Sequence, residues 1–296
     1  MNDRKQHVLR MAHQLFIEKG FQATSIQDIL DYSGISKGTF YNYFSSKNEL
    51  LISLFKSIHS QLDKERNELL IGKDPSDIEV FIKQIELQLQ THRSNKLISL
   101  FDEVVYSPDE ELKVFFKQNQ LRAVRWLYRR FIDIFGERSK PYLLDCSIMF
   151  IGILHYNLKF HAMAYDTTDL YKIVRYSVER LVKIVSDVTE ADAQLIQPGV
   201  LNNWFPNSGD GSQSIKQALC RTVLGMKKSS SNAQEQGKYL ELLDFIQDEL
   251  LHANTPRIHL VNSAISTLED GKTLFAENDI EKLKNLAESI ALDRME

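Results

Sequence analysis

The segment from residue 24 to residue 50 constrains the fold most, because it leaves room only for short helices joined by tight turns. Thr24 and Gln27 have the spacing of a capping box, in which each side chain satisfies the other's free backbone donor. Gly34 permits a tight turn, and Ser36 then caps a helix that runs to about Phe44. Two helices of about eight residues around a glycine turn predict a helix-turn-helix unit.

Helical patterns also flank this unit on both sides. An apolar stripe at helical spacing precedes it and ends at Gly20, a left-handed stop after which Phe21 can pack back on the helix; the stripe is Val8, Met11, Ala12, Leu15 and Phe16. Ser46 and Glu49 frame a second capping box, which opens a helix with an apolar face from Leu50 onward. The start of the chain therefore predicts a three-helix domain continued by a fourth helix.

The third helix carries an unusual outer surface. Phe40 and Phe44 are four residues apart and are expected on its inner face. The outer side then holds a cation, hydroxyls, an amide and two phenols, with a glycine that lets the backbone approach closely; these residues are Lys37, Gly38, Thr39, Tyr41, Asn42 and Tyr43. Such a set can bond phosphates and base edges without repelling a polyanion. Lys47, in the first turn of the next helix, is placed to reach a phosphate. A generic helical bundle explains each feature singly, whereas their combination favours DNA binding.

Charge and composition agree with DNA binding when the charges are counted separately for each part of the chain. The whole chain has a net charge of −4, but its first 50 residues carry six Lys/Arg against five Asp/Glu, and residues 190–296 carry ten against sixteen. A reader of one half-site needs only a few well-placed cations. No uninterrupted apolar run of roughly 18 residues, no signal peptide and no metal-binding cysteine spacing is recognisable. We therefore expect a cytoplasmic protein without membrane, metal or cofactor.

Four segments resemble the TetR family of bacterial repressors: residues 16–21, 24–29, 33–44 and 47–51. The resemblance covers the first 55 or so residues, and it implies double-stranded operator DNA as a partner. It further implies an all-α homodimer, whose helical-bundle regulatory domain holds a small apolar or amphipathic effector. Carried over by position, the expected DNA-binding residues are Thr24, Ser25, Ser36, Lys37, Gly38, Thr39, Tyr41, Asn42, Tyr43 and Lys47. Of these, Lys37, Thr39 and Asn42 are expected at base edges, the two tyrosines as positioning contacts, and Thr24 or Ser25 at a phosphate.

The middle of the chain continues as helices. Caps are predicted at residues 76–79 and 107–110, the second with Pro108 at the first helical position, and helices at 97–106, 141–164 and 169–188. By resemblance, the last two helices build the dimer interface. The effector candidates are His92, Phe101, Trp126, Tyr128, His155 and His161. Ordinary core packing is the favoured explanation for each of them taken singly, and the spacing of His155 and His161 does not suit a metal.

The chain then extends well beyond a typical relative. We expect three parts: a helix-turn-helix domain at 1–50, an effector-binding and dimerisation domain at 51–190, and a helical extension at 191–296. In the extension, a loop at 197–214 and a linker at 227–232 separate helices at 213–226, 233–252, 256–268 and 279–292. No catalytic constellation is recognisable, so no enzyme is predicted. The function expected is a homodimeric repressor released from DNA by its effector. The alternative is a protein-interaction adaptor acting through the acidic extension.

Overall fold

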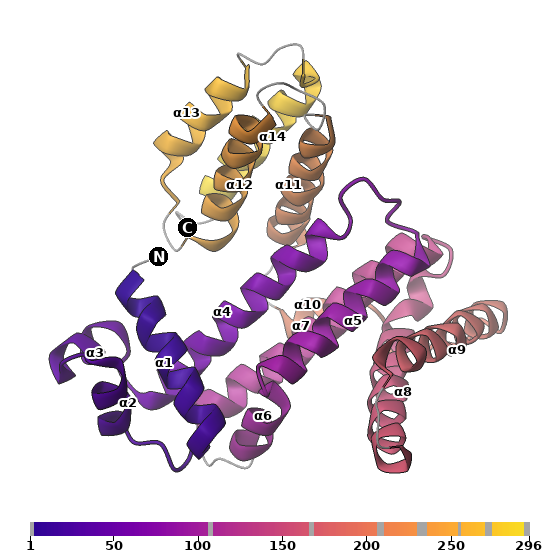
Figure 1. Cartoon of the computed structure of the whole chain (residues 1–296). Helices are drawn as coiled ribbons and strands as arrows, with labels where there is room; N and C mark the ends of the chain where they lie inside the picture. The colour runs from indigo at the N-terminus through magenta and orange to yellow at the C-terminus, as the bar shows by residue number, and fades with distance from the viewer. Residues whose placement is uncertain are drawn as a thin grey trace. The chain divides into compact units, whose positions relative to one another are not determined.

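The computed structural model describes residues 3–105, 109–165, 169–205, 210–229, 236–253, 256–269 and 274–292. Across these ranges the regular structure is helical and contains no strand, as the periodicity predicts (Figure 1). The chain forms two compact units. The first contains Met1–Arg66 and Pro75–Gln197, and the second contains Asn67–Asp74 and Pro198–Glu296.

The first unit begins with four helices: α1 (Asp3–Lys19), α2 (Ile26–Ser33), α3 (Lys37–Tyr43) and α4 (Lys47–Glu68). We call residues 3–46, which hold the first three helices and their turns, the head. Gly20 and Gly34 both have positive φ, +85° and +67°, as their positions at helix ends predict. The Phe21 ring packs edge-on against Phe16 with centroids 5.1 Å apart, so the chain folds back on the end of α1.

The cap of α2 lies one residue later than predicted. Ser25 is the N-cap: its hydroxyl accepts from the Asp28 amide at 3.1 Å, and the Asp28 carboxylate accepts from the Ser25 amide at 2.8 Å. Thr24 is buried instead, and its hydroxyl donates to the carbonyl oxygen of Gly20 at 2.7 Å. Both pairs, Thr24 with Gln27 and Ser25 with Asp28, have the capping spacing, so spacing alone cannot choose between them.

The rest of the first unit is a layer of longer helices: α5 (Ile78–Ser94), α6 (Leu97–Val105), α7 (Glu110–Phe135), the 3-10 turn η1 (Lys140–Tyr142), α8 (Leu143–Ala164) and α9 (Leu170–Glu190). The N-caps of α5 and α7 are Asp77 and Asp109, each of which accepts a hydrogen bond from a backbone amide of the first turn. The predicted caps at Ser76 and Ser107 are therefore displaced by one and two residues. Pro108 lies outside the described residues, and α7 begins after it.

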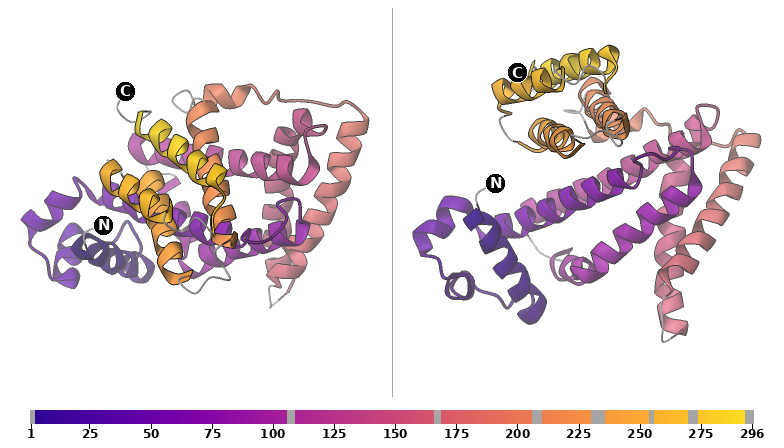
Figure 2. Two further views of the ribbon diagram at one scale, coloured as in Figure 1. Left: turned by 90° about the horizontal axis from the view of Figure 1, so that it is seen from above. Right: turned by 45° about the horizontal axis from the view of Figure 1, so that its top comes forward.

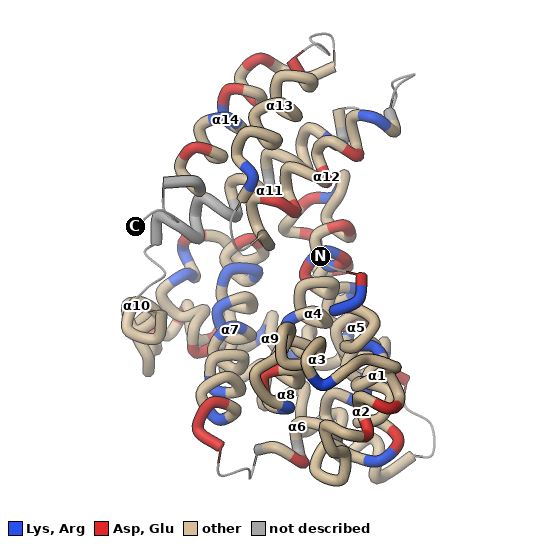
Figure 3. The backbone as a smooth tube through the Cα atoms, turned by 90° about the vertical axis from the view of Figure 1, so that its left-hand side faces the viewer, with Lys and Arg blue, Asp and Glu red and all other residues tan. Residues whose placement is uncertain are grey.

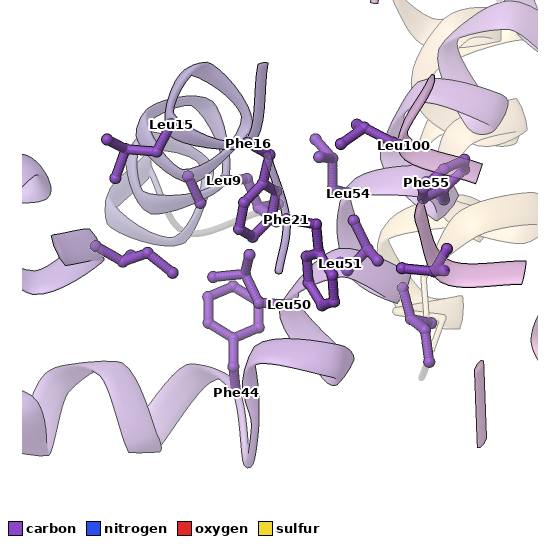
Figure 4. Close-up of a cluster of buried hydrophobic side chains, with 14 of the residues drawn as sticks. Leu9, Leu15, Phe16, Phe21, Phe44, Leu50, Leu51, Leu54, Phe55 and Leu100 are labelled. Carbon is purple, nitrogen blue, oxygen red and sulfur yellow. The ribbon is translucent and has the colours of Figure 1, made fainter. Parts of the chain in front are cut away.

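One hydrophobic core joins the head to the helices that follow it. Leu100 and Val104 of α6 and Phe115 and Phe116 of α7 are buried in the same cluster as Phe16, Phe40 and Phe44. Figure 4 shows Leu100 beside Leu54 and Phe55 of α4. A separate DNA-binding domain ending at residue 50 stays a prediction. The hydrophobic core contains residues on both sides of that boundary.

Helix α8 is unusual because its second half contains no buried residue. Leu143, Leu144, Cys146 and Phe150 near its start are buried, whereas no residue of α8 after Phe150 is. Among the described residues one helical stretch, Lys140–Ala164, is long and apolar enough to cross a membrane by length and composition, and 33% of its most apolar window is buried. The stretch contains no uninterrupted apolar run of about 18 residues, since Asp145 and Lys159 lie within it. By itself the stretch is weak evidence for a membrane.

The second unit contains a bundle of four helices with its own core (Figure 2). A short helix, α10 (Val200–Trp204), precedes α11 (Asp210–Ser229), α12 (Gln236–His252), α13 (Ile258–Glu269) and α14 (Glu277–Leu292). Two predictions need correction. The expected loop at 197–214 contains α10 and the start of α11, and Lys227 to Ser229 belong to α11 rather than to a linker. Lys227 pairs with Asp244 of α12 at 2.8 Å, which favours continuation of the helix. Residues 206–209 and 230–232 lie outside the described residues.

Candidate nucleic-acid interface

The candidate interface is built on α3, whose first turn is fixed by hydroxyl groups. The Ser36 side chain accepts from the amide of Thr39 at 3.2 Å, as a helix cap should. The two hydroxyls also bond to each other at 2.9 Å. The Ser36 and Thr39 side chains are therefore engaged in forming α3, in addition to any contact they make with a ligand.

The inner face of α3 is anchored by phenylalanines as predicted. Phe40 and Phe44 are buried, with ring centroids 5.7 Å apart. This anchoring turns Lys37, Gly38, Tyr41 and Asn42 outward, and all four are exposed. Tyr43 differs, because it is half-buried and packs against the core of the head. The structure thus brings four of the predicted residues together on one accessible face.

The electrostatics of this face suit a polyanion. No carboxylate occurs between Ser33 and Asn48, and Figure 3 shows no acidic residue along α3. The carboxylates on either side have hydrogen-bond partners: Asp31 accepts from the Gln27 side chain at 2.8 Å, and Asp28 and Glu49 are bound as follows. Hydrogen bonds from Ser25 and Lys19 hold the pKa of Asp28 far below its usual range, and hydrogen bonds from Ser45 lower the pKa of Glu49. Anchored carboxylates cannot swing toward a phosphate backbone, so they repel it less than free ones would.

Lys47 lies where the sequence did not predict. Its ammonium donates to the carbonyl oxygens of Phe21 at 2.8 Å and Thr24 at 2.7 Å, and it sits 4.4 Å from the centroid of the Phe21 ring. Burial lowers the pKa of Lys47. Lys47 and the buried Thr24 therefore form the inner support of the turn between α1 and α2. Sequence reasoning missed this arrangement because it depends on how two distant segments pack.

Ser25 is exposed but already committed to the cap of α2. Its hydroxyl donates to Asp28 at 2.6 Å, in addition to accepting from the Asp28 amide. A hydroxyl has one donor and two acceptor positions, so Ser25 can donate to a phosphate only by releasing the carboxylate. Its role at DNA stays a prediction.

The six effector candidates do not line one common cavity. Phe101 packs on Phe116 next to the head, with centroids 5.0 Å apart, and Tyr128 is buried. His155 is exposed, and His161 lies beside Tyr165 near the end of α8. The six residues are thus spread over separate places in the first unit.

Two of the candidates do share a neighbour. The shared neighbour is Arg66. Its guanidinium lies 4.0 Å from the centroid of the Trp126 ring, and that ring stacks on Phe81. His92 lies beside His59, with ring centroids 6.2 Å apart, and burial together with the nearby His59 and Arg66 lowers the pKa of His92 to about 4. Both histidine pKa values are lowered, which favours neutral rings.

The described surface has a groove of about 550 Å³ elsewhere, between α5 and α9. It is lined by Glu86, Gln90, Arg93, Ser94, Asp169, Leu170 and Tyr171, and none of the six candidates is among them. Within the described residues no group of three or more His, Cys, Asp or Glu side chains is placed to hold a metal ion.

Comparison with known proteins identifies the head. The family model described as "Bacterial regulatory proteins, tetR family" matches residues 8–54, which contain the helix-turn-helix just described. An uncharacterized HTH-type transcriptional regulator of Bacillus subtilis, YerO, is 29% identical over 98% of this chain and 97% of its own length. Residues 8–54 therefore carry a helix-turn-helix domain of the TetR type.

Some other relatives align with nearly the whole chain, whereas others align only with its N-terminal region. The B. subtilis regulator YuxN is 24% identical over 97% of this chain and 98% of its own, so the long C-terminal region is shared with both B. subtilis proteins. The transcriptional repressor KstR2 of Mycobacterium tuberculosis is 38% identical over 56 residues, 19% of this chain and 28% of its own. No solved structure matches the chain. The match over residues 8–54 makes the protein a DNA-binding helix-turn-helix transcriptional regulator, as predicted.

Proposed function

We propose that this regulator is a homodimeric repressor which leaves its operator when a small apolar or amphipathic effector binds. The observation that carries the proposal is the exposed polar face of α3, formed by Lys37, Gly38, Tyr41 and Asn42 without a carboxylate. Lys37 and Asn42 offer donors that fit guanine and adenine edges in the major groove. Tyr41, with Tyr43 at the edge of the face, is suited to phosphates. Of the other predicted residues, Ser36 and Thr39 lie at the start of α3 and Ser25 caps α2. Thr24 and Lys47 support the turn between α1 and α2.

The uncovered part of α8 supports a dimer. Large apolar side chains are exposed along this helix, with Met163 72% and Tyr156 57% exposed; the others are Ile148, Met149, Ile151 and Phe160. Continuous exposed apolar surface of this kind marks an interface. The helix is held within the protein, because Asn157 donates to Ser177 of α9 at 3.0 Å and Asp145 accepts from the amide of Leu195 at 2.7 Å. We assign a second copy as the occupant, since one self-complementary apolar face is what a twofold dimer needs.

A dimer gives the recognition helices a defined separation. Two copies of α3 related by a twofold axis enter successive major grooves about 34–36 Å apart, on a palindrome-like operator. An effector that binds better to a conformation with a different separation weakens operator binding by its differential affinity for the two states. Repression agrees with the name of the relative KstR2, a transcriptional repressor. Action on DNA places the protein in the cytoplasm.

The adaptor alternative rests on the acidic C-terminal region. Residues 190–296 carry six more acidic than basic side chains, which suits a basic protein partner better than DNA. An adaptor needs no operator, so it predicts indifference to substitutions on α3. The DNA-binding experiment below separates the two functions.

DNA binding is tested by fluorescence anisotropy on a duplex selected from random sequence by the wild-type protein, with unselected DNA as reference. Lys37→Ala and Tyr41→Ala are expected to weaken binding to the selected duplex about tenfold or more. Lys183→Ala, an exposed lysine of α9, is the matched control and should leave the affinity unchanged. Equal affinity of the wild type for selected and unselected DNA would overturn the operator function and favour the adaptor.

The dimer is tested by sedimentation equilibrium at micromolar concentration. We expect a dimer for the wild type and a monomer for Phe160→Glu, because the new carboxylate would be buried against the partner's apolar face. Val114→Glu replaces another exposed apolar residue, on α7, and should remain dimeric. A monomeric wild type, or a dimeric Phe160→Glu variant, would contradict the assigned interface.

A further inference from the structure

The turn between α1 and α2 receives a hydrogen-bond acceptor from far along the chain. The Glu103 carboxylate of α6 accepts from the backbone amide of Phe21 at 2.7 Å and from that of Gln22 at 3.4 Å. These amides follow Gly20, at the end of α1, and have no partner within a helix. A carboxylate bound to backbone amides forms a charge-assisted hydrogen bond, which is stronger and more directional than an apolar contact.

A positively charged side chain, Lys47, binds the carbonyl groups of the same turn. The Lys47 ammonium donates to the carbonyl oxygens of Phe21 and Thr24, as described above. Burial lowers the pKa of Lys47, and the nearby negative charge of Glu103 opposes that shift. The turn therefore lies between an acceptor from α6 for its N–H groups and a donor from α4 for its carbonyl groups.

Gly20 makes the close approach of Glu103 possible. A Cβ atom at this position would lie 3.2 Å from one carboxylate oxygen of Glu103 and 3.3 Å from the other. Its φ of +85° is also a conformation that glycine adopts without strain. The glycine predicted only as a helix stop thus also leaves room for a side chain of the regulatory helices.

Helix α6 is placed to connect the head to the rest of the first unit. Leu100 and Val104 lie in the core of the head, while α6 also contacts α5 and α7. A second link lies before its start, where Nε2 of His13 in α1 is 3.1 Å from the carbonyl oxygen of Asn95. The head is therefore held at two points, at the middle of α1 by the α5–α6 turn and at the end of α1 by Glu103.

We propose that Glu103 is a positioning residue which fixes the orientation of the head on α6, and thereby the half-site spacing that the dimer accepts. The apolar contacts of α6 fix which faces meet but set no preferred hydrogen-bond direction. The 2.7 Å bond from the Phe21 amide to Glu103 adds such a direction, together with the link from His13 to Asn95. The part of this inference that concerns half-site spacing rests on the proposed dimeric function, whereas the part that concerns orientation does not.

Head orientation is measured first, without DNA. Spin labels are placed on Asp31→Cys in α2 and Lys183→Cys in α9, in a chain whose two free cysteines, Cys146 and Cys220, are replaced by alanine. When this protein is diluted with unlabelled chains, pulsed electron paramagnetic resonance reports one intramolecular distance distribution. We expect a narrow distribution for the labelled parent and a broader one with Glu103→Ala. Glu111→Gln, which removes an exposed carboxylate of α7, is the charge control and should stay narrow. An unchanged distribution in Glu103→Ala would overturn the proposal.

Half-site spacing is measured second, on the selected duplex and on versions with one base pair added or removed between half-sites. The wild type should prefer the selected spacing, and Glu103→Ala should reduce that preference about fivefold or more. Its affinity for unselected DNA should not change, because α3 itself is untouched. A retained spacing preference would overturn the assignment. A wild type without any operator preference would overturn the proposed function instead, leaving head orientation to be decided by the distance measurement.

Discussion

The ammonium of Lys47 lies 2.7 Å from the carbonyl oxygen of Thr24, so a lysine at the start of α4 completes the turn between α1 and α2. The sequence places this lysine near DNA, at the first turn of a helix. The geometry instead gives it two backbone carbonyls and an aromatic ring as neighbours. We therefore expect this cation to contribute more to the stability of the head than to DNA affinity.

Lys47→Met should therefore destabilise the protein while leaving its electrostatic contact with DNA largely intact. Losing the donor leaves two carbonyls without their partner, and we expect a cost of about 1–3 kcal/mol in the free energy of unfolding. The measurement is urea unfolding combined with the salt dependence of operator binding. Lys37→Ala is the contrasting variant, since it removes an exposed cation of the α3 face and should therefore lower the salt slope. A larger loss of salt slope in Lys47→Met than in Lys37→Ala would restore the original assignment of Lys47 to the interface.

Gly20→Ala should destabilise the protein for two separable reasons. The positive φ costs an alanine about 1–2 kcal/mol, and its Cβ meets the Glu103 carboxylate. Thermal unfolding of the single variant and of Gly20→Ala combined with Glu103→Ala separates the two. We expect the second substitution to cost less in the alanine background than in the wild type. If the costs of the two substitutions in the free energy of unfolding were strictly additive, the Glu103 carboxylate would move away from the alanine Cβ without a penalty.

His92 should make the first unit less stable as pH falls. Its pKa is lowered from 6.5 to about 4 by burial, so between these values the unfolded chain binds a proton that the folded chain excludes. The free energy of unfolding therefore falls as pH falls from about 6.5 toward 4. His92→Gln should flatten part of that dependence in urea unfolding at a series of pH values. The exposed His155→Gln should not, and equal slopes in both variants would contradict the burial of His92.

Glu249 should make the second unit sensitive to stronger acid. Hydrogen bonds from Arg257, at 2.9 Å through Nε and 2.6 Å through a terminal nitrogen, lower the pKa of Glu249 from 4.5 to about 2. The folded state then holds the carboxylate ionised where the unfolded chain protonates it. Stability from this pair is complete above about pH 4.5 and is lost as pH falls toward 2.

The test is amide hydrogen exchange of α12 and α13 in the full chain between pH 5 and pH 3. Glu249→Gln should lower protection at pH 5 and weaken its dependence on pH. Glu241→Gln, an exposed glutamate on the same helix, is the control. A dependence on pH that is the same in the wild type and Glu249→Gln would show that this pair does not respond to acid as proposed.

Local chemistry made much of the head predictable. The ends of α1 and α2 at Gly20 and Gly34, the cap of α3 at Ser36 and the burial of Phe40 and Phe44 all depend on residues within about one helical turn. The single error of this kind, Thr24 in place of Ser25, arose because two adjacent pairs have the same spacing. The caps of α5 and α7 were displaced for a similar reason, since several polar residues precede each helix.

The sequence by itself determined that this chain is helical, where most of its helices lie, and which side of α3 is polar. Tertiary structure alone decided what Lys47 and Glu103 do, because their partners are backbone groups 23 to 82 residues away that no local pattern specifies. It also decided that the six effector candidates are dispersed and that the second half of α8 lacks cover. A helix pattern shows that a face is apolar, but only the packed chain shows whether its own neighbours have already buried it.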